Sequence, residues 1–161
     1  MALKSDRTHI SSRIDFFMNE AAERGGCVVV STAGSGAAMD QAVQLCTYAA
    51  NPSGVKPLGI LMCDMVNLDL TRQKENVHKE EVQQGGKVTI WQQGEVLTNR
   101  ILTGHTPTTG SPAFVAHSGW IATTDVASDA VSTNNRHIGT WMSSKDEDGY
   151  AKLAVNLPQT F

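Results

Sequence analysis

The residues best suited to cofactor chemistry lie where the apolar run 27–30 leads toward Gly34 and Gly36. In a dinucleotide-binding unit, such glycines follow a strand and let the backbone approach a pyrophosphate at a helix N-terminus. Here Met39 stands at the third position of the pattern, and no alternation of strands and helices follows. A turn of small residues between two strands is the preferred interpretation. A nucleotide-binding enzyme that uses the Gly34–Gly36 loop is kept as an alternative.

Other catalytic and metal-binding patterns are incomplete. Gly86-Lys87 is followed by Val88, where a phosphate-binding loop needs serine or threonine. The acidic residues 146–148 resemble a calcium loop, but its last ligand would fall in the apolar stretch 154–157, so a turn is expected. The five histidines lack metal-ligand spacing, and the three cysteines form no C-x-x-C pair. We therefore predict no enzyme, with no catalytic residue, metal or cofactor.

The three tryptophans, Trp91, Trp120 and Trp141, all fall in predicted strands. Aromatic side chains in strands more often pack in a core or at its rim than form a ligand platform. A glycan-binding β-module that presents Trp91 or Trp120 is a second alternative.

The elements that must position these residues are short strands separated by glycine-rich turns. Val88 and Ile90 alternate with polar residues, and Gln93-Gly94 is expected to turn the chain into a second strand, 95–101. Asp148-Gly149 is expected to supply the left-handed positions of a tight hairpin turn. The charged segment 71–84 is expected to be solvated. Further strands are predicted at residues 27–30, 44–49, 58–62, 66–70, 113–116, 120–123, 136–141 and 151–157.

This pattern predicts a mainly β fold, a small barrel or sandwich with at most one or two short helices. The chain of 161 residues is long enough for one core, and we divide it into an N-terminal arm, 1–24, and a β-rich domain, 25–161. Residues 11–24 are expected to form a short helix that stops at Gly25 and Gly26, or an extended arm.

Charge is distributed unevenly along the chain. Its net charge is −3, which argues against direct nucleic-acid binding, and no apolar run is long enough to cross a membrane as a helix. The arm nevertheless carries Lys4, Arg7 and Arg13. An extended arm could add as a strand to the edge of another subunit, with Phe16 or Phe17 in a hydrophobic slot.

The order of several segments resembles the head decoration, or cement, proteins of tailed bacteriophages. The resemblance is carried by residues 96–101, 110–115, 119–121, 138–139 and 148–157, and upstream by residues 15–26 and 67–73. It covers about residues 15–158 through short glycine-rich and apolar elements.

This resemblance implies a lambda-like decoration protein with a small β-barrel or β-tulip fold. It further implies a homotrimer at three-fold or quasi-three-fold sites that binds the major capsid protein and stabilises the expanded shell. The protein would be made in the host cytoplasm and end on the outer surface of the virion. The residues expected to bind the capsid are those of the arm, Lys4, Arg7, Arg13, Phe16 and Phe17.

Overall fold

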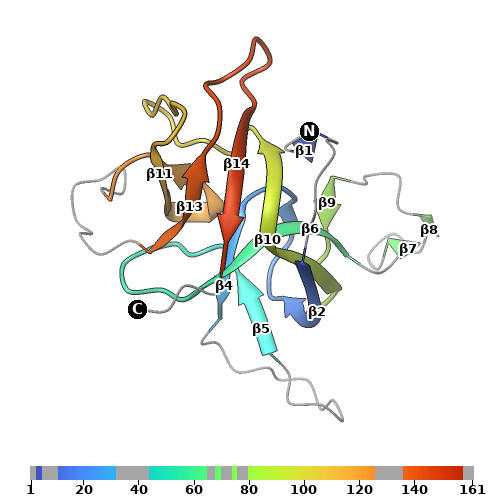
Figure 1. Cartoon of the computed structure of the whole chain (residues 1–161). Coiled ribbons are helices and arrows are strands. Elements are labelled where there is room, and N and C mark those ends of the chain that lie inside the picture. Colours follow the sequence, from blue (N-terminus) through green and yellow to red (C-terminus); the bar gives the residue numbers. More distant parts are fainter. Residues whose placement is uncertain are drawn as a thin grey trace.

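Most of the regular structure of this chain is antiparallel β-strand (Figure 1). The computed structural model describes residues 3–4, 11–31, 44–64, 68–69, 74–75, 80–125 and 136–157. Ten of the strands in these ranges belong to one continuous sheet. The strand β10 runs through the middle of the molecule and joins the two halves of that sheet.

Five of the described strands close into a barrel, in the order β10-β2-β5-β4-β6 and back to β10. All neighbours in it are antiparallel except β2 and β5, which are parallel. These strands are β2 (Ser11–Met18), β4 (Cys27–Val30), β5 (Gln44–Thr47), β6 (Pro57–Asp64) and β10 (Lys87–Thr98).

The interior of this barrel is filled by side chains that alternate along its strands. Val88 and Ile90 of β10 are fully buried, whereas the intervening residue Thr89 is half-buried. Phe16 and Met18 of β2 are buried in the same way. Because successive residues of a strand point to opposite faces, this two-residue period packs one face of each strand inside. The cluster consists of Phe16, Met18, Val28, Cys46, Leu61, Val82, Val88 and Ile90.

Beyond the barrel, β10 continues into a second curved sheet in the order β10-β14-β13-β11-β12. Its strands are β11 (Pro112–Val115), β12 (Ile121–Ala122), β13 (His137–Trp141) and β14 (Ala151–Asn156). Residues 100–102, which follow soon after β10, pair with β12 at the far edge of this sheet. The Ile121 amide donates to the Arg100 carbonyl, and the Leu102 amide donates to the Ile121 carbonyl, both over 2.9 Å.

The second sheet therefore also curves round a core of its own. This core includes the outward-facing residues Cys27, Val29 and Ile60 of the barrel, so the two halves share a packed boundary. The full cluster is Cys27, Val29, Ala49, Ile60, Val96, Ile101, Ala113, Val115, Ile121, Ile138, Trp141, Ala151, Leu153, Val155 and Leu157.

Short elements complete the described fold. The strand β3 (Ala22–Glu23) pairs with β9 (Glu81–Val82), and β7 (Leu68–Asp69) pairs with β8 (Lys74–Glu75). The strand β1 (Leu3–Lys4) pairs with β10, and a 3-10 turn, η1, spans His117–Gly119.

The predicted mainly β barrel fold is confirmed. Of the two alternatives for residues 11–24, the helix is wrong and the extended conformation is the one observed in β2 and β3. These residues form β2 and β3, and β2 is hydrogen-bonded to β10 on one side and β5 on the other. Pairing on both edges satisfies the backbone without a helix and buries Phe16 and Met18 on the same face. The division into an arm, 1–24, and a domain, 25–161, stays a prediction.

The predicted hairpin at Gln93-Gly94 is also wrong, because β10 is one unbroken strand. Gly94 has a φ of +128°, a conformation that side chains rarely adopt, and it pairs with Val155 of β14. The glycine thus marks the place where β10 passes from the barrel into the second sheet, not a reversal of the chain.

At the other predicted turn, Gly149 has the expected left-handed conformation, with a φ of +82°, while Asp148 does not. The connection is the loop 142–150, longer than a two-residue hairpin, and Asp146 Oδ1 accepts from the amides of Asp148 and Tyr150.

The prediction that the whole segment 71–84 is solvated is wrong at Val82. This side chain is fully buried because β9 pairs with β3.

Gly139 of β13 offers a test of how closely the second sheet is packed. A Cβ at this position would collide with the carbonyl group of Ala154 in the neighbouring strand. Gly139→Ala should therefore lower the free energy of unfolding by about 1–3 kcal/mol, the usual cost of overpacking. Urea unfolding measures this loss, with Thr140→Ala as the control that should lose less. A Gly139→Ala protein as stable as the wild type would contradict the close contact.

Candidate functional site

The described parts of the basic N-terminal segment, β1 and β2, pair with β10 of the same chain. Lys4 of β1 pairs with Leu97, and Arg13 of β2 pairs with Ile90, both in antiparallel register. Arg7 lies outside the described residues. Two parts of the predicted arm are therefore paired with the same strand, one at each end of it.

The two phenylalanines of the arm have different environments. Phe16, 6% exposed, belongs to the core of the barrel, whereas Phe17 is half-buried and pairs with Lys87. The ring of Phe16 is thus used within the chain itself. Phe17 is the phenylalanine of the pair that keeps partial exposure.

The two N-terminal strands are anchored to very different extents. β2 has eight residues and lies between β10 and β5, so its removal would open the barrel. β1 has two residues and, among the described strands, pairs with β10 alone. A strand held by so few backbone hydrogen bonds can leave its edge at a small cost in free energy.

The predicted glycine loop at Gly34 and Gly36 lies outside the described residues, but the strands flanking it are described. β4 and β5 are antiparallel neighbours, with Val29 opposite Thr47. A dinucleotide-binding unit instead joins its first strand through a helix to a parallel neighbour. The local topology therefore does not favour the nucleotide-binding alternative.

The tryptophans do not form a common exposed platform. Trp141 is fully buried, Trp91 is half-buried against the second core, and Trp120 is half-buried beside Arg100. The indole Nε1 atoms of Trp91 and Trp141 are buried and have no hydrogen-bond partner within the described part of the chain. The arrangement offers no support for the glycan-binding alternative.

Tyr48 connects the barrel to the second sheet, a role that the sequence did not indicate. Its hydroxyl donates to the carbonyl of Glu23 over 2.5 Å and accepts from the amide of Gly26 over 3.2 Å. Its ring packs on Gly26 and Gly119, where added Cβ atoms would lie 2.9 Å or less from it. Burial raises the pKa of this phenol, which keeps the donating proton in place.

A charged side chain extends this junction to the surface. Arg100 Nη2 lies 2.7 Å from Glu23 Oε2, and its guanidinium stands 5.2 Å from the ring of Trp120. The amide of Ser118, in a left-handed conformation with a φ of +52°, donates to the Ala49 carbonyl over 2.7 Å. The double glycine at residues 25–26 is the one feature of the sequence that marks this junction. The sequence pattern predicts a helix stop there instead.

Two of the three cysteines, Cys27 and Cys46, are buried as free thiols. Burial raises the pKa of Cys27 to about 12 and that of Cys46 to about 12, so both stay protonated at neutral pH. The described residues contain no group of three or more histidine, cysteine or acidic side chains that could hold a metal ion. They also contain no helix long and apolar enough to span a bilayer.

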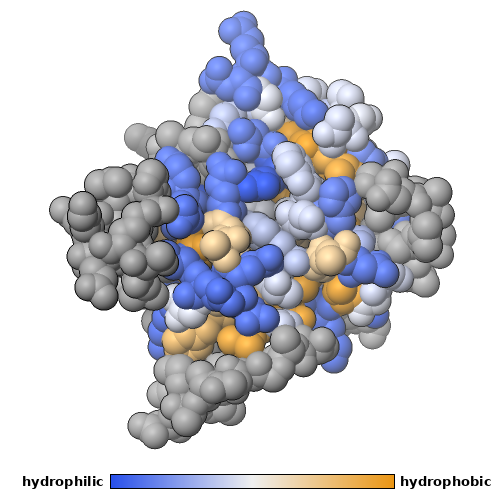
Figure 2. All heavy atoms as spheres, turned by 180° about the vertical axis from the view of Figure 1, so that it is seen from behind, coloured by the Kyte–Doolittle hydropathy of each residue, from blue (hydrophilic) through white to orange (hydrophobic). Residues whose placement is uncertain are grey.

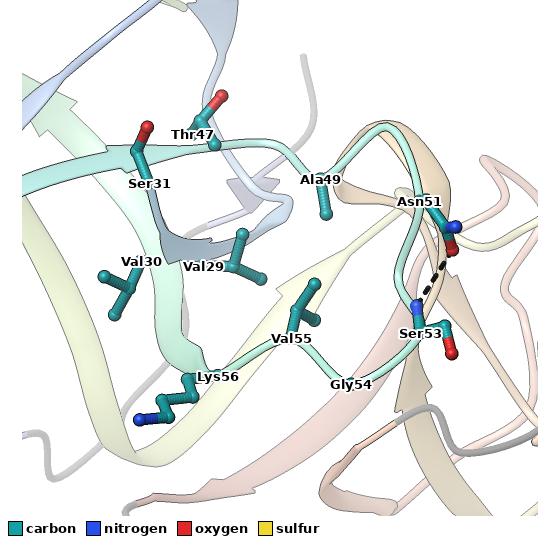
Figure 3. Close-up of a pocket in the computed structure, with 10 residues that line it drawn as sticks. All are labelled: Val29, Val30, Ser31, Thr47, Ala49, Asn51, Ser53, Gly54, Val55 and Lys56. Atoms are coloured by element: carbon teal, nitrogen blue, oxygen red, sulfur yellow. Dashed lines mark hydrogen bonds between the residues drawn. The ribbon is translucent and has the colours of Figure 1, made fainter. Parts of the chain in front are cut away.

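A pocket of about 490 Å³ opens between β4, the end of β5 and the loop before β6 (Figure 3). Val29, Ala49 and Val55 form its apolar wall, and the exposed Val30 and Lys56 lie at one side of it. Hydroxyl and amide side chains complete the lining, namely Ser31, Thr47, Asn51 and Ser53, with Gly54.

His105 is held neutral at the base of the loop that follows β10. Its Nδ1 accepts from the amide of Thr123 over 3.2 Å and lies 3.0 Å from the hydroxyl of the same residue. Desolvation by burial, and secondarily the charge of Lys145, lower the pKa of this ring below its ordinary value of 6.5. A protonated His105 would lose its acceptor site at Nδ1.

The hydroxyl of Tyr48 should contribute measurably to stability. Tyr48→Phe keeps the ring between its glycines and removes both hydrogen bonds, so the free energy of unfolding should fall by about 1–3 kcal/mol. Chemical denaturation measures this difference. Equal stability of the variant and the wild type would mean that the hydroxyl does not hold the junction together.

His105 should make stability depend on pH. The pKa of His105 is lower in the folded chain than in the unfolded chain, so the unfolded chain binds more protons between these two pKa values. Stability is therefore lost as the pH falls from the ordinary pKa toward the lowered one. Between about pH 7.5 and about pH 5, the melting temperature of wild type should drop more than that of His105→Asn. The asparagine can supply an acceptor at the Nδ1 position without titrating. Parallel melting profiles would show that His105 is not the responsible group.

Comparison with known proteins adds no relative to this picture, since no protein-family model and no curated protein matches the chain.

Proposed function

We propose that this chain is a structural virion protein that binds the outer surface of a tailed-phage capsid and stabilises the expanded shell. In this proposal it acts as a homotrimer at three-fold or quasi-three-fold sites, and its partner is the major capsid protein. The observation that carries the proposal is the short strand β1, which contains Lys4 and pairs, among the described strands, with β10 alone, in the half of β10 that also pairs with β14.

The closed barrel is suited to a structural role. Ring closure leaves few free strand edges, and the two cores meet across a packed boundary at Val29 and Ile60. Such a body can carry load without changing shape. The resemblance of the segment order to that of decoration proteins is a separate reason for proposing this role.

The N-terminal segment supports a role for strand exchange in attachment. β1 is bound to its own body by pairing at Leu97 and Thr98 alone among the described residues, whereas β2 is held on both edges. The strand β1 can therefore leave this edge and pair with an edge on the shell, while β2 keeps the barrel closed. Many copies on one shell would turn a weak contact into firm attachment.

One face of the molecule is consistent with attachment by backbone pairing and charge (Figure 2). On the face seen in Figure 2, the hydrophobic side chains of the described residues show as separate patches between hydrophilic ones. An obligate apolar interface would need a larger continuous patch on the face that it used. Attachment through an exchanged basic strand does not require one.

The proposal is tested by mixing the purified protein with expanded shells of the encoding phage that lack it, and by measuring its mass in solution. We expect co-sedimentation with shells, saturation at a fixed number of copies, and a trimer in solution or on the shell. Failure to bind expanded shells, together with a monomeric mass, would overturn the proposal.

A truncation that removes residues 1–10 isolates the contribution of the exchanged strand. Because β2 begins at Ser11, the barrel should keep its melting temperature, while shell binding should weaken by about tenfold or more, as expected when one of two linked contacts is lost. The double variant Lys4→Gln and Arg7→Gln is the charge control and should make binding less sensitive to salt. Equal binding by the truncated protein would show that attachment uses another surface.

A further inference from the structure

We infer that the pocket between β4, the end of β5 and the loop 51–56 binds a small amphipathic carboxylate, with its apolar body on the valine wall and its carboxylate beside Lys56. This inference goes beyond the proposed role on the capsid and does not depend on it.

The shape and lining of the pocket support a small ligand. Its volume of about 490 Å³ lies within the range of small-molecule sites, which are mostly apolar with a few polar groups that fix orientation. The wall is built by Val29, 2% exposed, Ala49, 6% exposed, and the half-buried Val55. Figure 3 shows these three side chains directed toward the same space.

The walls of the pocket are fixed in place before any ligand binds. The Val30 amide donates to the Lys56 carbonyl over 3.1 Å, and the Ser31 amide donates to the Leu45 carbonyl over 2.9 Å. In the loop, Asn51 Oδ1 accepts from the amide of Ser53 over 3.0 Å. The ligand therefore does not have to order the strand ends and loop that surround it, which lowers the cost of binding.

Charge decides which kind of ligand fits. Lys56 is the one charged residue among the ten described residues that line the pocket, and the carboxylate of Glu20, outside this lining, already accepts from the hydroxyl of Thr47. Val30 beside it is 39% exposed, a large apolar side chain at the rim. A ligand with an apolar body and one negative group would cover this valine and pair with the ammonium group.

The test uses three matched probes that share one body: 4-phenylbutyrate, 4-phenylbutan-1-ol and 4-phenylbutylamine. Each is titrated into the ¹⁵N-labelled full-length chain while the amide signals of Val30, Val55 and Lys56 are followed. We expect saturable shifts there, with the acid bound about threefold more tightly than the alcohol, as for an exposed ion pair, and the amine bound most weakly.

Two variants separate the charge from the apolar wall. Lys56→Gln should bring the affinity for the acid down to that for the alcohol and leave the alcohol unchanged, while Lys145→Gln, on a distant loop, should keep the preference. Val30→Ser should weaken all three probes. Unchanged amide spectra outside the pocket show that each variant is folded.

The inference is overturned if none of the probes shifts these amides saturably, or if Lys56→Gln keeps the preference for the acid. It is also overturned if these amides respond to capsid shells and to none of the probes, because the occupant would then be a protein. The probe titrations by themselves do not bear on whether the chain binds capsids, since shell binding is measured without the probes.

Discussion

The long strand β10 must serve two curved sheets at once, and the rest of the fold depends on that constraint. Its first half closes the barrel by pairing with β2 and β6, and its second half pairs with β14. The strand buries Val88 and Ile90 in one core and Val96 in the other. The change of partner occurs near Gly94, where a positive φ lets the strand bend without losing its ladder.

The two halves joined by this strand also meet at the packed boundary that contains Val29 and Ile60. Tyr48 adds a further connection by inserting its ring between Gly26 of the barrel and Gly119 of the turn η1. Thr98 adds a buried hydrogen bond to the carbonyl of Gly25 over 2.8 Å. The glycines at these positions are therefore contact surfaces, and their lack of a side chain is what allows the halves to approach closely.

The fold class could be predicted from the sequence because short runs such as 27–30 and 151–157 carry their own local pattern. The predictions failed where distant pairing decides the structure. Residues 11–18 contain polar positions compatible with a helix, and only the strands on both sides make them β2. Gly94 was expected to reverse the chain, since a glycine that bends a strand looks the same in sequence as one that ends it. Neither Tyr48 nor the pocket had a local signal, because both are assembled from separate segments.

The same constraint explains why the two proposed binding functions can coexist on a small barrel. β2 completes the barrel, so β1 can pair with β10 or leave it without opening the core. The pocket lies instead at the ends of β4 and β5, and the strand β4 is itself paired on both edges. Attachment through the N-terminal segment would therefore leave the pocket walls intact. A ligand at Lys56 would likewise leave β1 free to exchange, so the two activities should be separable by mutation.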